Sequence, residues 1–345
     1  MTPPASLTYW DYLQLLPLLR LQSGVEDDDA RLSEDELHFI VVHQVFELWL
    51  KLILRELRLG RDRMAAEWVP EKHVPHVVRH LKRVNEILKL SLDSFAVLET
   101  LTPQDFLAFR KKLGESSGFQ SFQMRQMELL LGLRPAERRG ADPVADLVAA
   151  AASVPGAESI VRELERARTE PSLRDGLLNW LYRTPVQGHS PGDAGDAETV
   201  AAFLAEYRTA LAAYDRQLLA EFDAYTAPAS GPATVRQRAG LLFIESYRDL
   251  PLLSWPYVLI DTVVEMEELL VLWRTRHARM VERMIGRRAG TGGSPGVAYL
   301  DATTQYRIFH EFWTVRTLLL PHDRLPPLRH RERYELTRSL TGESG

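Results

Sequence analysis

The chain has 345 residues, a hydrophobic content of 45% and a formal net charge of −5. A chain of this length can bury a sizeable core, as one large domain or two smaller ones. Lysine and arginine are spread along the chain, which argues against a nucleic-acid or anionic-membrane partner. The sequence contains no cysteine, which excludes disulfides, iron–sulfur clusters and thiolate-bound metal centres. Any metal must therefore be held by histidine or carboxylate.

The N-terminal residues, MTPPASLTYWDYL, lack the basic start and continuous apolar stretch of a signal peptide. No later run approaches the roughly 20 apolar residues that a membrane span needs. The absence of cysteine also fits a reducing compartment. We therefore expect a cytoplasmic protein without a membrane partner.

Apolar residues recur at three- and four-residue spacing through most of the chain, which predicts an all-α fold. Ser33 can cap the first strong helix, with Glu36 reaching back as in a capping box. Thr102 can cap another helix, with Pro103 at its first position. The expected helices are, in chain order, 33–59, 76–95, 102–114, 119–131, 157–168, 172–182, 199–225, one ending near 249, and 256–288.

Three stretches rich in proline, glycine, serine and aspartate lose the helical periodicity and are predicted to be loops: 134–143, 184–197 and 226–234. A glycine-rich segment, 289–296, follows the last long helix. Nucleotide-binding glycine loops follow a strand and carry spacings that this segment lacks. We therefore interpret it as flexible backbone that closes over a small-molecule pocket, with Thr291 offering a hydroxyl.

Most of the ten histidines are expected to be structural or solvated. His73, His76 and His80 lie among lysines and arginines, and the pair His76/His80 lacks the third ligand of a zinc site. His43 differs because large apolar residues surround it in FIVVHQVFELWL, and Phe39 shares its helix face. We expect an aromatic surface beside an imidazole there, the alternative being a satisfied core histidine.

Phe106, Phe109 and Arg110 share one face of a predicted helix, so that an aromatic surface carries a single guanidinium. The fork geometry of arginine suits bidentate capture of a ligand carboxylate. An internal salt bridge of Arg110 with Glu47 or Glu99 is the alternative, and the spacing alone does not decide between them.

Four separated segments, taken in order, resemble the tryptophan 2,3-dioxygenase family. They are HFIVVHQVFELWLK (38–51), LETLTPQDFLAFR (98–110), GESSGFQSFQMRQMELLLG (114–132) and WRTRHARMVERMIGRRAGTGGSPGVAYL (273–300). An N-terminal YWDYL (9–13) resembles a fifth. The resemblance spans about 7–327, and 140–233 matches only in its helical character.

The resemblance implies an architecture and a cofactor. Residues 1–345 would form one helical domain, a haem-binding bundle with a smaller helical insertion around 140–233. The protein would be a homotetramer with one haem b per subunit. Tyr9 and Tyr12 would complete the site of a neighbouring subunit.

It also implies roles for individual residues. His277 would be the axial ligand of the haem iron, which leaves the opposite face open for dioxygen. His43 would lie near the indole N–H as a positioning and hydrogen-bonding group, because the indole proton is too weakly acidic for an ordinary histidine to remove. Phe39 and Phe106 would pack against the indole ring, and Arg110 would clamp the substrate carboxylate.

Thr291 and the glycine-rich loop would bind the substrate ammonium group. Three positions depart from the family pattern: Trp10 stands where a glycine is usual, Pro295 where a serine is common, and Phe106 where many bacterial members have tyrosine and animal-type members phenylalanine. The implied reaction opens the indole ring of L-tryptophan with dioxygen to give N-formyl-L-kynurenine. The alternatives are a haem-dependent monooxygenase that converts tryptophan or a β-methyl tryptophan to a 2-oxindole, and a haem sensor without turnover.

Overall fold

The computed structural model describes residues 7–138, 143–151, 156–291 and 296–335. Helices make up nearly all of the regular structure in these ranges, and the one β-bridge found there joins Val186 and His189. The prediction of an all-α fold is confirmed.

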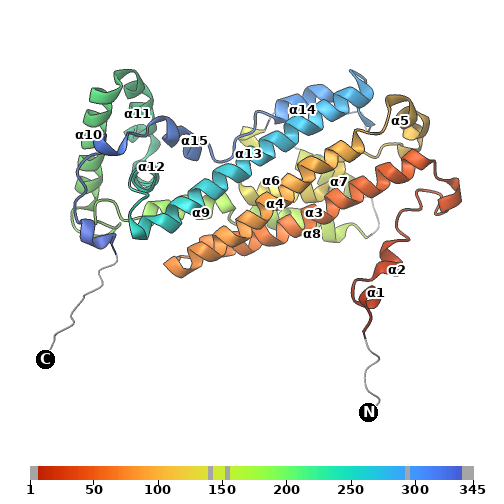
Figure 1. Ribbon diagram of the computed structural model, residues 1–345, viewed down its shortest axis with the longest axis horizontal. Helices are drawn as coiled ribbons and strands as arrows, with labels where there is room; N and C mark the ends of the chain where they lie inside the picture. Colours follow the sequence, from red (N-terminus) through yellow and green to blue (C-terminus); the bar gives the residue numbers. More distant parts are fainter. Residues whose placement is uncertain (1–6, 139–142, 152–155, 292–295, 336–345) are drawn as a thin grey trace, which may run out of the picture.

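Three long helices form the body of the molecule: α3 (Glu34–Met64), α4 (Val74–Leu98) and α13 (Pro251–Ile285). They lie side by side along the long axis in Figure 1, with α4 in contact with both α3 and α13. Their facing sides are apolar and buried, as at Leu57, Leu81 and Val263. The predicted capping box of Ser33 and Glu36 starts α3. These helices provide a rigid frame on which side chains of distant segments meet.

Two predicted boundaries of these helices were wrong. Helix α3 continues through Gly60 to Met64, because the backbone at Gly60 packs against Val77 and Leu81 of α4 and this contact outweighs the low helix propensity of glycine. Helix α13 begins at Pro251 and includes Pro256, which was expected to start it.

Shorter helices surround this body, and three of them (α7, α14 and α15) were not predicted. The predicted helix 199–225 is in fact two, because the extended backbone of Asp215 (φ −147°) ends the first and its side chain caps the next turn. The shorter helices are α5 (Pro103–Phe109), α6 (Phe122–Leu131), α7 (Pro143–Ala151), α8 (Glu158–Thr169), α9 (Leu173–Arg183), α10 (Asp196–Tyr214), α11 (Leu219–Tyr225), α12 (Pro232–Ser246), α14 (Val297–Thr303) and α15 (His310–Thr317).

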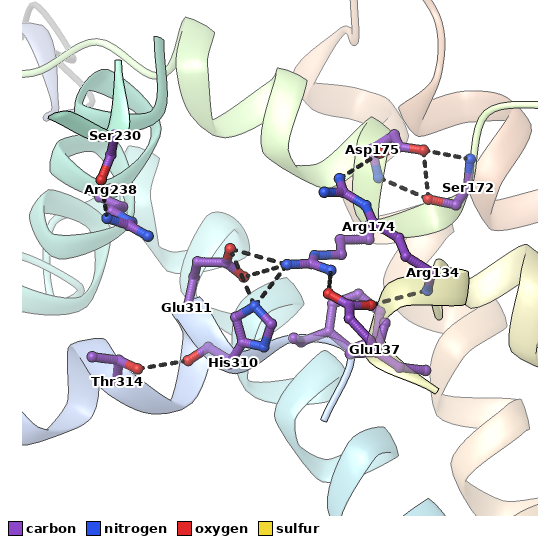
Figure 2. Close-up of polar contacts among 12 residues, drawn as sticks. Arg134, Glu137, Ser172, Arg174, Asp175, Ser230, Arg238, His310, Glu311 and Thr314 are labelled. Atoms are coloured by element: carbon purple, nitrogen blue, oxygen red, sulfur yellow. Dashed lines mark hydrogen bonds and ion pairs between the residues drawn. The ribbon is translucent and has the colours of Figure 1, made fainter. Parts of the chain in front are cut away.

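A buried arginine ties three of these segments together (Figure 2). Arg174, at the start of α9, pairs through Nη1 with Glu137 at 2.8 Å and through Nη2 with Glu311 of α15 at 3.1 Å. The same Nη2 donates to Nε2 of His310 at 2.8 Å. This network fixes α15 against α9 and the turn that precedes α7.

The N-terminal helices α1 (Tyr9–Tyr12) and α2 (Leu15–Leu18) project from the body at one end (Figure 1). The segment 7–18, which contains both helices, has several exposed hydrophobic side chains: Leu7, Tyr9, Trp10, Tyr12, Leu13 and Leu16. An apolar segment that contacts so little of its own chain is a candidate surface for another molecule.

By length and composition, helix α3 alone among the described helices could cross a membrane. The core helix of a soluble protein passes the same test. The contacts of α3 with α4, α5, α6 and α9 are those of a central helix in a helical bundle.

Candidate active site

A cavity of about 780 Å³ opens between α3, α5, α6, α13 and α14. Its size is typical of small-molecule and cofactor sites. All four segments that resemble the family line it, and its walls are mainly apolar, including Phe46, Phe95, Leu98, Trp273, Met280 and Met284. The fold thus brings together residues that are far apart in the sequence.

His277 lies on α13 and lines this cavity. Its ring stacks on Phe95 at 6.0 Å between centroids and contacts Trp273 at 5.1 Å. Burial, together with the nearby His43 and Arg125, lowers the pKa of His277 to about 4. The imidazole is therefore neutral near pH 7, the form that ligates iron.

In the part of the chain that the structure describes, no three histidine, aspartate or glutamate side chains cluster around His277 or anywhere else. A free metal ion would need such a set of ligands. A haem iron needs only one, because the porphyrin supplies the rest. The donor set and the apolar walls therefore fit haem.

His43 lies on α3 and lines the same cavity. Its Nδ1 is 2.7 Å from the carbonyl oxygen of Phe39. Because a carbonyl only accepts, the proton of the neutral ring is on Nδ1 and Nε2 keeps a free lone pair. Desolvation by the cavity walls lowers the pKa of His43 below its usual value.

The side chain of His43 is exposed to the cavity and is not packed inside the bundle. The alternative considered from the sequence, a satisfied core histidine, was therefore wrong. Its neighbour Phe39 packs against it, with the two rings tilted by 34° and their centroids 3.9 Å apart. Phe39 also contacts Phe106 at 5.8 Å and Phe109 at 5.6 Å, so the expected aromatic surface is present.

Arg110 ends α5 and also lines the cavity. Its Nη2 donates a hydrogen bond of 2.6 Å to the carbonyl oxygen of Ala289. The salt bridges considered from the sequence are not formed, because Glu99 pairs with Arg276 at 2.6 Å and Glu47 accepts from Gln123 at 2.7 Å.

Thr291 lines the cavity as well, at the start of the glycine-rich loop. Residues 292–295 of that loop, including Pro295, lie outside the described residues. Tyr9 and Tyr12 do not join the cavity of their own chain. They lie on α1 with 71% and 75% of their surface exposed.

Sequence reasoning missed the charged wall of the cavity, formed by Arg125, Glu128 and Arg274. The segment FQMRQMELLL carried the only signal, a charged pair three residues apart in a helix that is otherwise largely apolar.

The prediction of three solvated histidines was wrong for His80. Its side chain is buried, and its Nδ1 lies 2.5 Å from Glu56 of α3. Its Nε2 faces Nε2 of His76 at 2.8 Å. The basic residues around His80 in the sequence suggested a solvated side chain, but its partner Glu56 lies on α3, a contact that the local sequence does not show.

The protein is all-helical and has an apolar cavity. A neutral histidine suited to haem iron, an aromatic surface and an arginine line this cavity. The model of the family described as tryptophan 2,3-dioxygenase matches residues 3–319. A protein of Sorangium cellulosum named tryptophan 2,3-dioxygenase is 41% identical over 95% of this chain and 87% of its own length.

Other relatives agree. Tryptophan 2,3-dioxygenase 2 of Ralstonia nicotianae is 40% identical over 95% of this chain and 97% of its own length. The tryptophan 2,3-dioxygenase of Bdellovibrio bacteriovorus is 34% identical over 93% of this chain and 95% of its own length. The chain therefore belongs to the tryptophan 2,3-dioxygenase family and is an enzyme of this class of haem-dependent oxygenases.

Proposed function

We propose that this protein opens the indole ring of L-tryptophan with dioxygen and releases N-formyl-L-kynurenine. In this reaction the C2–C3 bond of indole breaks, and each carbon receives one oxygen atom of the same dioxygen molecule. The main support for the proposal is that one cavity is lined by a neutral His277, by His43, by the aromatic surface and by Arg110. The names of the relatives support the same reaction.

His277 would hold one haem b per subunit, and the apolar walls would cover the porphyrin faces. When bound, haem supplies the iron chemistry that activates dioxygen. The chain itself binds and orients the substrate and excludes water from the cavity.

The substrate would lie along the aromatic surface, with its indole ring against Phe39 and Phe106. The free lone pair on Nε2 of His43 would accept a hydrogen bond from the indole N–H, since Phe39 holds the ring proton on Nδ1. We assign His43 a positioning role for this reason. Arg110 would bind the carboxylate through guanidinium donors other than the one held by Ala289, and the Thr291 hydroxyl would meet the ammonium group.

The assembly is part of the proposal. We propose a cytoplasmic homotetramer in which Tyr9 and Tyr12 reach the cavity of a neighbouring subunit, supported by the exposed apolar side chains of α1 and α2. We also propose that residues 1–345 form one domain with a helical insertion around 140–233. One hydrophobic cluster that includes α3, α4, α9, α10, α12 and α13 supports it.

Two variants test the function. Reduced, haem-loaded protein should convert L-tryptophan, and tryptamine, which lacks the carboxylate, should be a poor substrate. The Arg110→Met variant should lose this preference while keeping its haem.

His277→Ala should lose haem and turnover together, and added imidazole should restore part of the haem spectrum. A His277→Ala protein with an unchanged haem spectrum would remove the basis of the proposal.

A further inference from the structure

Four charged side chains meet at the cavity: Arg125 and Glu128 of α6 and Arg274 of α13 line it, and Arg138 lies behind them in contact with Glu128. Their side chains are almost fully buried, with exposed fractions of 9%, 3%, 7% and 2% respectively. Glu128 pairs with Arg125 at 2.9 Å, with Arg138 at 2.8 Å and with Arg274 at 3.4 Å. One carboxylate thus forms ion pairs with three guanidinium groups.

The positive charge of this cluster is in excess of its acidic partner. Among the described residues, Arg125 Nε and Arg138 Nη2 have no hydrogen-bond partner. After Glu128, the other carboxylate whose negative charge acts on Arg274 is that of Glu267. The oxygens of Glu267 accept hydrogen bonds from the backbone of Phe309 at 3.1 Å and the indole of Trp313 at 2.7 Å. The wall therefore presents unbalanced cationic charge in a setting where water screens little.

Part of this charge lies in the cavity of the candidate iron ligand. Arg125, Glu128 and Arg274 line the same cavity as His277, and Arg274 precedes His277 by three residues on α13. The positive charge of Arg125 also acts on the His277 imidazole, where it adds to the effect of burial in lowering the pKa. A charge that acts on the imidazole acts on an iron bound to it as well.

We propose that the cluster of Arg125, Glu128, Arg138 and Arg274 raises the reduction potential of the iron held by His277, and so keeps it in the ferrous state that binds dioxygen. The inference rests on the proposed function, because it needs haem at His277. The physical reason is electrostatic: reduction of ferric iron by one electron lowers the positive charge of the centre by one unit. Nearby cations that are poorly screened therefore favour the reduced form.

The test is a spectroscopic reductive titration of haem-loaded wild type and charge variants. Arg125→Gln should lower the ferrous-to-ferric ratio at a fixed applied potential about tenfold, which corresponds to about 59 mV for a one-electron couple. Glu128→Gln removes the one acid and should shift the ratio the other way. Arg125→Lys, which keeps the charge, should stay close to wild type.

Arg58→Gln is the matched control, because Arg58 of α3 also contacts α6, at Gln126, but does not line the cavity. The reduction potential of Arg58→Gln should equal that of the wild type.

Arg138→Gln is the second variant, for the case that Arg125→Gln does not hold haem. It should also lower the reduction potential, since Arg138 belongs to the cluster but does not line the cavity. Unchanged potentials, or shifts of one sign in Arg125→Gln and Glu128→Gln, would overturn the inference. A wild type that binds no haem through His277 would instead overturn the proposed function.

Discussion

Arg110 donates a hydrogen bond of 2.6 Å to the carbonyl oxygen of Ala289, although 179 residues separate them in the sequence. The contact joins the end of α5 to the segment that follows α13, and therefore holds two walls of the cavity together. Because the partner is a neutral carbonyl, the guanidinium charge is not compensated by this contact. It remains available to a carboxylate that enters the cavity.

Replacement of Arg110 by methionine should raise the KM for L-tryptophan about tenfold to hundredfold, the loss of a charge-assisted hydrogen bond of about 1.5–3 kcal/mol. The haem absorbance should not change. Lys111→Met is the control, because Lys111 is exposed and does not line the cavity. Loss of haem from the Arg110 variant would show that this arginine supports the cofactor site and not the substrate.

The pH dependence of turnover should reflect the neutral state of His43. Its pKa is lowered, mainly by desolvation, so the ring stays unprotonated below its usual pKa of about 6.5. We expect kcat/KM to be level from about pH 8 to about pH 6.5 and to fall only at lower pH. A fall that begins well above this range would contradict a neutral hydrogen-bond acceptor.

Substitution of His43 separates positioning from acid–base catalysis. His43→Ala should lower kcat/KM about tenfold, the loss of one hydrogen bond, and leave measurable turnover. His43→Gln supplies another acceptor and should recover part of this loss. Complete inactivity of both variants would indicate that His43 carries an essential proton transfer.

The buried Arg174 network should contribute to stability (Figure 2). Arg174→Met leaves Glu137 and Glu311 partly buried without their cation, which should lower the free energy of unfolding by about 3–5 kcal/mol. Arg166→Met is the control, because Arg166 pairs with Glu170 while its side chain is 57% exposed, and its replacement should lower the stability far less. Urea unfolding measures both. Equal losses in the two variants would contradict a special role for the buried network.

A chain of hydrogen bonds at α4 predicts acid sensitivity. Arg79 can only donate to Nδ1 of His76 (2.7 Å), so His76 donates through Nε2 to His80, and His80 donates to Glu56. Both rings must be neutral. Burial, and then the positive charge of Arg63, lowers the pKa of His76.

A group whose pKa is lowered by folding stabilises the folded state above its unfolded pKa, and this stability is lost as the pH falls below that value. Wild type should therefore lose more stability between about pH 7.5 and about pH 5.5 than the variant His76→Gln. Urea midpoints at the two pH values measure the difference. An equal loss in both proteins would exclude His76 as the sensitive group.

Much of the site could be predicted because its residues lie on helices with clear periodicity. The spacing of Phe39 and His43 placed both on one face, and the structure has them in contact. The capping box at Ser33 and the cap at Thr102 were also readable. In each case the signal is local, because neighbours along a helix determine it.

The features that were missed depend on contacts between distant segments. The break at Asp215 depends on one residue in an extended conformation within an apolar pattern that otherwise continues. The burial of His80 depends on α3 lying against α4, and the charged wall depends on α6 meeting α13. The spacing of charges along the sequence carries no information about such pairings.

In the proposed reaction the enzyme inserts both atoms of one dioxygen molecule into L-tryptophan. Reduced, haem-loaded protein should therefore be incubated with L-tryptophan under isotopically labelled dioxygen, and the product analysed by mass spectrometry. We predict a ring-opened product that carries two labelled oxygen atoms. A product with one labelled oxygen and an intact C2–C3 bond would contradict the account.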